Sequence, residues 1–181
     1  MKRPVAIVAL VGVAALGSCG EREPAEHSGT ETAGAIEVAH FPLNDGAVPP
    51  DADAAFDPAV SQDGGGSLRV QADRGGRLRL YRLEDLGVVQ GAVAFTGFLR
   101  SRGLNGRAVL EMWCRPAEGD AAFVRGYGSA VTGDADWTPQ EVRFSNPALC
   151  RNPVSIELNV LIEGAGTVWI DDLRLWSVPV G

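Results

Sequence analysis

The chain has 181 residues, of which 22% are charged and 45% hydrophobic, and its net charge at pH 7 is −7. This length is enough for one domain with a hydrophobic core, and the composition is typical of a globular protein. An acidic chain gains nothing from counterion release on a nucleic acid, so the charge excludes nucleic acid as a partner.

Residues 1–18 have the pattern of a bacterial lipoprotein signal peptide. Lys2 and Arg3 form a positive n-region, and residues 5–16 form an apolar h-region that is too short to span a bilayer. The segment ends in Leu16-Gly17-Ser18-Cys19, which resembles the lipobox of bacterial lipoproteins. The alternatives are an ordinary secretory signal or an uncleaved anchor.

The lipobox resemblance implies cleavage before Cys19 and acylation of its thiol and amine, with palmitate as one such chain. Gly20 follows where Asp would retain the protein at the inner membrane, so we expect a lipid anchor in the cell envelope, on the outer membrane, with the side of that membrane left open. Removal of Lys2 and Arg3 would change the net charge to −9, from 14 basic and 23 acidic residues.

Residues 19–35 contain no large apolar side chain and are rich in Glu, Gly, Ser and Thr. Such a segment cannot bury enough surface to fold, so it is predicted to be a disordered tether. The folded domain is expected over residues 36–178.

The domain has the alternating pattern of an all-β protein with about nine strands. After the first strand, residues 42–58 are expected to form a long irregular loop. Gly97 suggests a β-bulge, residues 103–106 suggest a turn, and Gly164 with Gly166 suggests another. The predicted strands are 36–41, 67–72, 77–83, 91–100, 107–115, 121–129, 140–144, 154–162 and 164–176. Their spacing predicts two antiparallel sheets packed as a sandwich.

Three cysteines are present, and if Cys19 carries lipid, Cys114 and Cys150 remain in an oxidising compartment. They are predicted to form one disulfide, with two free buried thiols as the alternative. A zinc site is poorly supported, because the two His residues, His27 and His40, lack a ligand spacing relative to the cysteines.

Four motifs occur in this order: Gly-Ser-Leu-Arg-Val at 66–70, the strand at 91–100, Asp-Trp-Thr at 136–138 and Gly-Ala-Gly-Thr-Val-Trp-Ile-Asp-Asp-Leu at 164–173. Together they resemble the galactose-binding-domain-like jelly roll, especially the carbohydrate-binding modules attached to xylanases and laminarinases. The resemblance implies a structural calcium ion held by Asp171 or Asp172. The usual N-terminal carboxylate is displaced here, and the alternative is an exposed or hydrogen-bonded Asp pair.

The related modules bind glycans on a concave sheet, here expected to hold strands 77–83, 154–162, 107–115 and 121–129 side by side. Alternation places one set of side chains inward: Leu78, Leu80, Leu110, Met112, Cys114, Ile156, Leu158 and Val160. It places a second set outward: Arg79, Tyr81, Glu111, Trp113, Glu157 and Asn159. Aromatic planes and planar polar groups are the mixture that sugar recognition requires. Alternatively, Trp113 packs under a loop or against the tether, and Arg79 with Glu157 forms a cross-strand salt bridge.

Catalysis is not expected. Glu111 and Glu157 could share a face, as a glycosidase pair requires, but the sequence indicates no pocket around them. The other tryptophans, Trp137, Trp169 and Trp176, are interpreted as packing residues. The sequence therefore predicts a membrane-anchored, non-catalytic lipoprotein that binds a polysaccharide or envelope glycan. The alternative is an envelope protein-interaction or structural lipoprotein on the same scaffold.

Overall fold

Antiparallel strands form nearly all of the regular structure in this computed structural model, which describes residues 34–50, 52–86, 91–144 and 146–179. The expected signal peptide, Cys19 and tether residues up to 33 lie outside the described residues. Within the described part, no helix is long and apolar enough to cross a membrane. The strands are β1 (Ile36–Phe41), β2 (Ala55–Asp57), β3 (Ser67–Ala72), β4 (Gly76–Glu84), β5 (Ala92–Pro116), β6 (Ala122–Arg125), β7 (Val131–Arg143) and β8 (Pro153–Val178), with 3-10 turns η1 (Tyr127–Ser129) and η2 (Pro147–Cys150).

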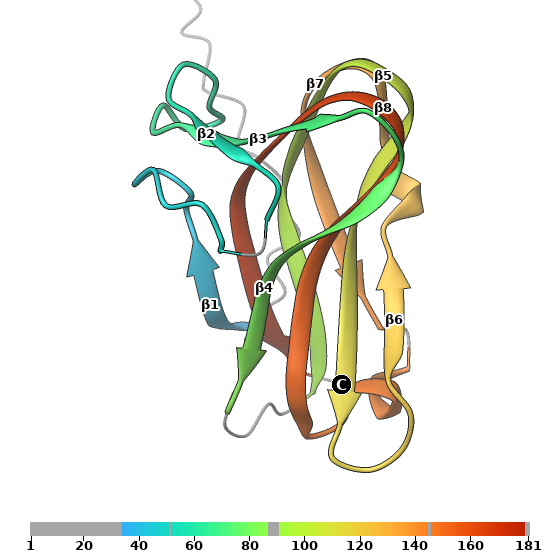
Figure 1. The fold of residues 1–181 in the computed structure, drawn as a ribbon. Helices are drawn as coiled ribbons and strands as arrows, with labels where there is room; N and C mark the ends of the chain where they lie inside the picture. The colour runs from blue at the N-terminus through green and yellow to red at the C-terminus, as the bar shows by residue number, and fades with distance from the viewer. Residues whose placement is uncertain (1–33, 51, 87–90, 145, 180–181) are drawn as a thin grey trace, which may run out of the picture. The chain divides into compact units, whose positions relative to one another are not determined.

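The long strands β5 and β8 pair with each other from Ala92 opposite Val178 to Pro116 opposite Pro153 and pass through both layers of the sandwich (Figure 1). In the first layer, β7 pairs with the start of β5, and β3 and β1 share the free edge of the end of β8. In the second layer the order is β4–β8–β5–β6. The predicted all-β, two-sheet architecture is confirmed, including the order of the second sheet.

The strands expected to end at two glycine turns continue instead. Gly106 lies opposite Gly164 with φ angles of 133° and 128°, which L side chains rarely adopt. A Cβ on Gly106 would overlap the Glu163 carbonyl, and one on Gly164 would overlap that of Asn105. Glycines in a paired strand therefore mark where both chains bend together from one sheet to the other. Four predicted strands thus become two, and the short β2 lies inside the expected loop.

The inner faces of the two sheets share one hydrophobic core. All eight residues predicted to point inward are buried, at 9% exposure or less: Leu78, Leu80, Leu110, Met112, Cys114, Ile156, Leu158 and Val160. From the first sheet they meet Leu68, Phe95 and Ile170, which are fully buried. The predicted alternation phase of the second sheet is therefore confirmed for these positions.

A disulfide joins Cys114, near the end of β5, to Cys150 in η2, with 5.6 Å between the Cα atoms. Both residues are buried in the core cluster. The predicted pairing is confirmed, and it ties the η2 turn to the end of the second sheet.

Candidate binding face

The outer side of the β4–β8–β5–β6 sheet carries polar and aromatic side chains in cross-strand rows; we call it the polar face. One row is Arg82, Glu157, Trp113 and Phe123. The next row is Arg79, Asn159, Glu111 and Arg125. Five of the six predicted site residues therefore lie in these two rows, because directly opposed residues of antiparallel strands point to the same side of the sheet.

Tyr81, the sixth predicted residue, does not lie on the polar face. The register of β4 against β8 shifts between Arg79 and Tyr81, so that Tyr81 lies opposite the buried Leu158 and Arg82 lies opposite Glu157. This bulge moves the alternation by one position. The Tyr81 ring stacks on Phe41 at 3.7 Å between centroids, and burial raises its pKa to about 12. The predicted outward orientation of Tyr81 was wrong, and Arg82 points outward in its stead.

Glu111 points outward from the sheet, as predicted, but its side chain is fully buried. Its Oε1 pairs with Arg77 Nε and accepts from Trp113 Nε1 at 2.7 Å, while its Oε2 accepts from Arg125 Nε at 2.6 Å. These neighbours cover the carboxylate and supply the donors that a buried charge requires. The expectation of a solvent-facing carboxylate is therefore corrected.

Asn159 is likewise fully buried rather than exposed, opposite Glu111. Its Nδ2 lies 3.5 Å from Glu111 Oε1, and its Oδ1 has no hydrogen-bond partner among the described residues. Glu157 pairs with Arg82 at 3.2 Å, in the place that the alternative interpretation gave to Arg79, and Arg82 also reaches Glu84 at 2.8 Å. The bulge in β4 explains the exchange, because it brings Arg82 into the row of Glu157.

An aromatic pair occupies the β5–β6 side of the polar face. The rings of Trp113 and Phe123 stack with centroids 4.7 Å apart and planes at 24°, and Phe123 is 49% exposed. The guanidinium of Arg77 lies 4.7 Å from the Trp113 ring, and that of Arg125 lies 4.7 Å from the Phe123 ring. Both cation–π contacts hold the guanidinium groups beside the aromatic pair.

Sequence reasoning missed Phe123, Arg77 and Arg125 as members of this group. Segment 121–129 has no clear alternation, because β6 is only four residues long and is followed by η1. The position of Arg77, two residues before Arg79, was a usable signal, because the two share the outward phase of β4.

A second ion-pair group extends the polar face towards η1. Arg107 pairs with Glu163, its guanidinium lies 4.3 Å from the Tyr127 ring, and the Tyr127 hydroxyl donates to Glu163 at 3.3 Å. The hydrogen bond from Arg107 lowers the pKa of Glu163. The hydrogen bond to Glu111 raises the pKa of Arg125.

Asp171 and Asp172 occupy a bulge in β8, where two β5 residues, Thr96 and Phe98, face Arg174 and Asp171. The predicted bulge at Gly97 is confirmed, although the extra residue belongs to β8. Asp172 has φ 46°, a left-handed conformation that Asp tolerates. The bulge explains how two carboxylates interrupt an apolar strand: Ile170 and Leu173 are both buried on either side of them.

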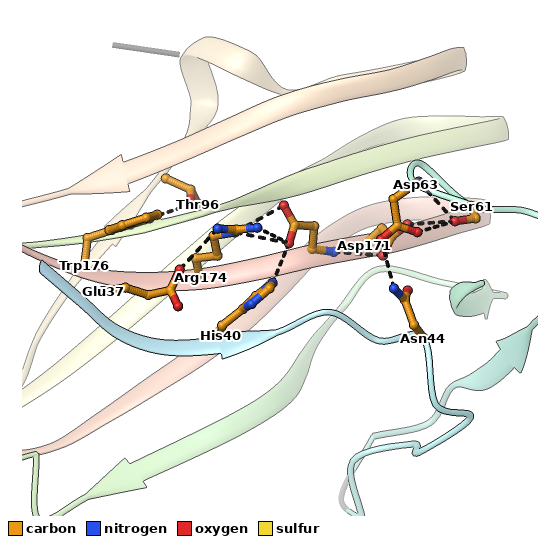
Figure 2. A network of polar contacts seen from close by, with 10 residues as sticks. Glu37, His40, Asn44, Ser61, Asp63, Thr96, Asp171, Arg174 and Trp176 are labelled. Atoms are coloured by element: carbon orange, nitrogen blue, oxygen red, sulfur yellow. Dashed lines mark hydrogen bonds and ion pairs between the residues drawn. The ribbon is translucent and has the colours of Figure 1, made fainter. Parts of the chain in front are cut away.

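Protein donors already surround both carboxylates, and Figure 2 shows Asp171 beside Ser61. Asp171 accepts from Gln62 N and Asp172 N, each at 2.8 Å, and from the Ser61 hydroxyl at 3.4 Å. Asp172 pairs with Arg174 at 3.1 Å and lies 2.7 Å from His40 Nε2. Across the described ranges, no group of three or more His, Cys, Asp or Glu could hold a metal ion.

A calcium ion takes six to eight oxygen ligands. Asp172 is committed to cationic or N–H partners, and Asp171 is committed to N–H and O–H donors, so these contacts do not fit that demand. The calcium site stays a prediction, and the hydrogen-bonded Asp pair is the alternative that these contacts favour.

The three remaining tryptophans each donate their indole N–H at 2.9 Å: Trp137 to Ser61 O, Trp169 to Asp57 Oδ2 and Trp176 to Thr96 Oγ1. All three are half-buried. The hydrogen bond from Trp169 lowers the pKa of Asp57. These contacts agree with a packing role, since the first two hold the 57–66 segment against β7 and β8, and the third joins the neighbouring strands β8 and β5 of the first sheet.

No family model matches the sequence, and no curated protein matches it. Solved structures do share its fold. The CBM22-1 xylan-binding domain of Paenibacillus barcinonensis Xyn10C superposes with a TM-score of 0.56 at 14% identity, over 81% of this chain and 97% of that one. The CBM22-2 xylan-binding domain of the same protein gives 0.55 at 8%, over 78% and 99%.

A third similar structure contains the CBM22-1 and GH10 modules of Clostridium thermocellum Xyn10B complexed with xylohexaose. It gives a TM-score of 0.57 at 14% identity, over 80% of this chain and 29% of that one. These likenesses establish the jelly-roll fold of carbohydrate-binding modules for this chain.

Proposed function

We propose that the domain is a non-catalytic carbohydrate-binding module that binds a polysaccharide on the polar face. The observation that carries the proposal is the stacked pair of Trp113 and Phe123, flanked by arginines and fixed by a buried carboxylate. The exposed part of the Phe123 ring offers an apolar surface to the C–H face of a pyranose, and the adjacent N–H donors suit its hydroxyls. The shared fold with xylan-binding modules supports the proposal.

The contacts of Glu111 argue against catalysis on this face. A glycosidase needs one carboxyl group that delivers a proton and a second that acts as base or nucleophile. Glu111 is fully buried, and both of its oxygens are engaged by arginine. It is therefore placed to orient neighbours and not to exchange protons with a substrate.

The binding proposal is tested by affinity gel electrophoresis of residues 36–181 on a panel of polysaccharides that includes xylan. Trp113→Ala and Phe123→Ala should each abolish retardation on the polymer that retards the wild type. Ile36→Ala is the matched control, because Ile36 is an apolar residue of the first sheet with 68% exposure. Absence of retardation on every polymer, or retardation unchanged by both aromatic substitutions, would refute the proposal.

We further propose that Cys19 attaches the domain to the cell envelope through lipid, with the segment after it as the tether. The lipobox-like Leu16-Gly17-Ser18-Cys19 supports this placement. The full chain expressed in a diderm bacterium should partition into the membrane fraction, and mass spectrometry should find acyl chains on Cys19. Cys19→Ser should release the protein; an unmodified Cys19 in mature protein would contradict the anchor.

A further inference from the structure

The polar face is basic although the chain is acidic. The four strand segments of the second sheet contribute six outward arginines: Arg77, Arg79, Arg82, Arg107, Arg115 and Arg125. The same segments contribute four outward glutamates: Glu84, Glu111, Glu157 and Glu163. The face thus holds six of the 16 basic residues but only four of the 23 acidic ones. It carries a surplus of two positive charges on a chain whose net charge is −7.

The positive surplus is concentrated around Glu111. This one carboxylate is shared by two guanidinium groups, those of Arg77 and Arg125. Elsewhere on the face each paired arginine has at least one carboxylate of its own, because Arg82 pairs with two carboxylates and Arg107 pairs with one. An anion is therefore attracted to the Glu111 end of the face.

The geometry of the two arginines suits a carboxylate ligand. Both approach Glu111 through Nε, and their side chains keep 42% (Arg77) and 26% (Arg125) of their surface exposed. A guanidinium carries five N–H donors in a planar fork, so binding through Nε leaves further donors for a second anion. The aromatic contacts with Trp113 and Phe123 hold each fork in a fixed position. Two preorganised guanidinium groups thus lie next to the stacked rings.

From these observations we infer that the polar face binds an acidic polysaccharide, whose uronate carboxylate pairs with Arg77 and Arg125 while its pyranose ring lies on the Trp113–Phe123 pair. This inference rests on the proposed function and specifies its ligand class. The negative charge of the remaining surface repels a polyanion, so the pairing must be local and short-ranged. Its affinity should fall as salt screens the interaction.

The test compares polyuronates with their own neutral derivatives. Polygalacturonate, alginate and glucuronoxylan are each used before and after carbodiimide-borohydride reduction, which converts the carboxylate to a primary alcohol and keeps the ring. Binding of residues 36–181 is measured by isothermal titration calorimetry at low and high salt. At least one acidic polymer should bind about tenfold more tightly than its reduced form, the difference expected of one charge-assisted hydrogen-bonded pair.

Three variants assign the effect to the face. Arg77→Gln and Arg125→Gln should each lower affinity for the acidic polymer about tenfold and lower affinity for the reduced polymer by a clearly smaller factor. Arg143→Gln, on β7 of the first sheet, is the matched control and should bind as the wild type does. Thermal unfolding of each variant confirms folding, and Arg77→Lys, which keeps the charge but not the fork, should fall between Arg77→Gln and the wild type.

The outcomes separate the inference from the proposed function. Equal affinity for acidic and reduced polymers, with loss in Trp113→Ala, overturns the acidic ligand and leaves glycan binding in place. If Arg143→Gln lowers the preference for the acidic polymer as much as Arg77→Gln does, the placement of the ligand beside Glu111 is overturned. No binding to any polymer in either form refutes the proposed function itself.

Discussion

The buried carboxylate of Glu111 gives the most direct test of the polar face. Glu111→Gln keeps the side-chain volume but removes the charge and replaces one acceptor oxygen by an NH₂ group that faces donors. The carboxylate has no solvent exposure and binds Arg77, Arg125 and Trp113 Nε1. Both arginines are partly exposed, at 42% and 26%, so they can recover water after the change.

Losing charge-assisted hydrogen bonds at a buried site costs about 1.5–3 kcal/mol for each bond, and the rehydrated arginines offset part of that loss. We therefore expect Glu111→Gln to lower the free energy of unfolding by about 2–4 kcal/mol. For a domain of this size, the midpoint of thermal unfolding would fall by roughly 5–15 °C. Urea unfolding of residues 36–181, with the disulfide intact, measures the change.

Glu157→Gln is the matched control. It is the same substitution on the same face, but Glu157 is 28% exposed and pairs with Arg82 at 3.2 Å. Screened by solvent, that pair should contribute at most about 1 kcal/mol. If Glu111→Gln is no more destabilising than Glu157→Gln, Glu111 is not the buried centre of the polar face, and the positioning of Arg77 and Arg125 by it is refuted.

Three further predictions follow from the fold. Replacing both Cys114 and Cys150 by Ser should lower the free energy of unfolding by about 4 kcal/mol on the chain-entropy model for a 36-residue separation, as urea unfolding would measure; a loss below about 1 kcal/mol would contradict a disulfide that constrains the unfolded chain. Gly106→Ala and Gly164→Ala should each prevent folding or lower the free energy of unfolding by more than about 3 kcal/mol, because the Cβ would overlap a carbonyl of the opposite strand. Gly128→Ala, with open space around it, should unfold at nearly the wild-type temperature. Near-wild-type circular dichroism and unfolding of Gly106→Ala and Gly164→Ala would exclude the close approach of β5 and β8 at these glycines. Burial, with Asp63 nearby, raises the pKa of Asp171 above 3.8, so the folded protein binds a proton at this carboxylate more tightly than the unfolded chain does. The stability that Asp171 contributes is therefore complete below pH 3.8 and is lost as the pH rises through the raised pKa. The unfolding free energy of the wild type relative to Asp171→Asn should be greater at pH 4 than at pH 7, and the opposite trend would show that the carboxylate is not desolvated as described.

The alternation of apolar and polar residues was sufficient to predict which side chains of the second sheet point inward, whereas the order of its strands was predicted from the resemblance to the jelly roll. Strands 107–115 and 154–162 alternate with a period of two, with the exception of Val109 and Leu161, which are apolar and lie opposite each other in the outward phase. The pairing of Cys114 with Cys150 followed from the number of cysteines and the expected compartment. The alternation is a local property of each strand, and the disulfide follows from the number of cysteines, so neither prediction needs knowledge of tertiary contacts.

The errors arose where the backbone departs from a regular strand. A single extra residue in β4 turned Tyr81 to the core, and no residue type in that segment marks the bulge. The glycines at 106 and 164 were read as turns, since glycine permits a turn and a strand crossing equally well. The burial of Glu111 depends on Arg77 and Arg125, which belong to two other strands, so alternation alone predicts its side but not its exposure.

The identity of residue 111 is informative because a carboxylate is a costly choice at a fully buried position. Buried ion pairs are often replaced by apolar residues with no loss of stability, so stability alone does not account for Glu111. The double variant Glu111→Leu with Asn159→Leu replaces both buried polar groups of one cross-strand pair by side chains that can pack together. We expect it to be more stable than Glu111→Gln, because it buries no side-chain amide, although Trp113 Nε1 loses its acceptor.

Glycan binding by that double variant should nevertheless be lost, because Arg77 and Arg125 no longer have the carboxylate that fixes them beside Trp113 and Phe123. Calorimetry with the polymer that binds the wild type measures this separation of stability from affinity. A double variant that is stable and binds as the wild type does would show that Glu111 does not position the arginines. A variant that is stable and does not bind would show that the buried carboxylate serves recognition and not folding.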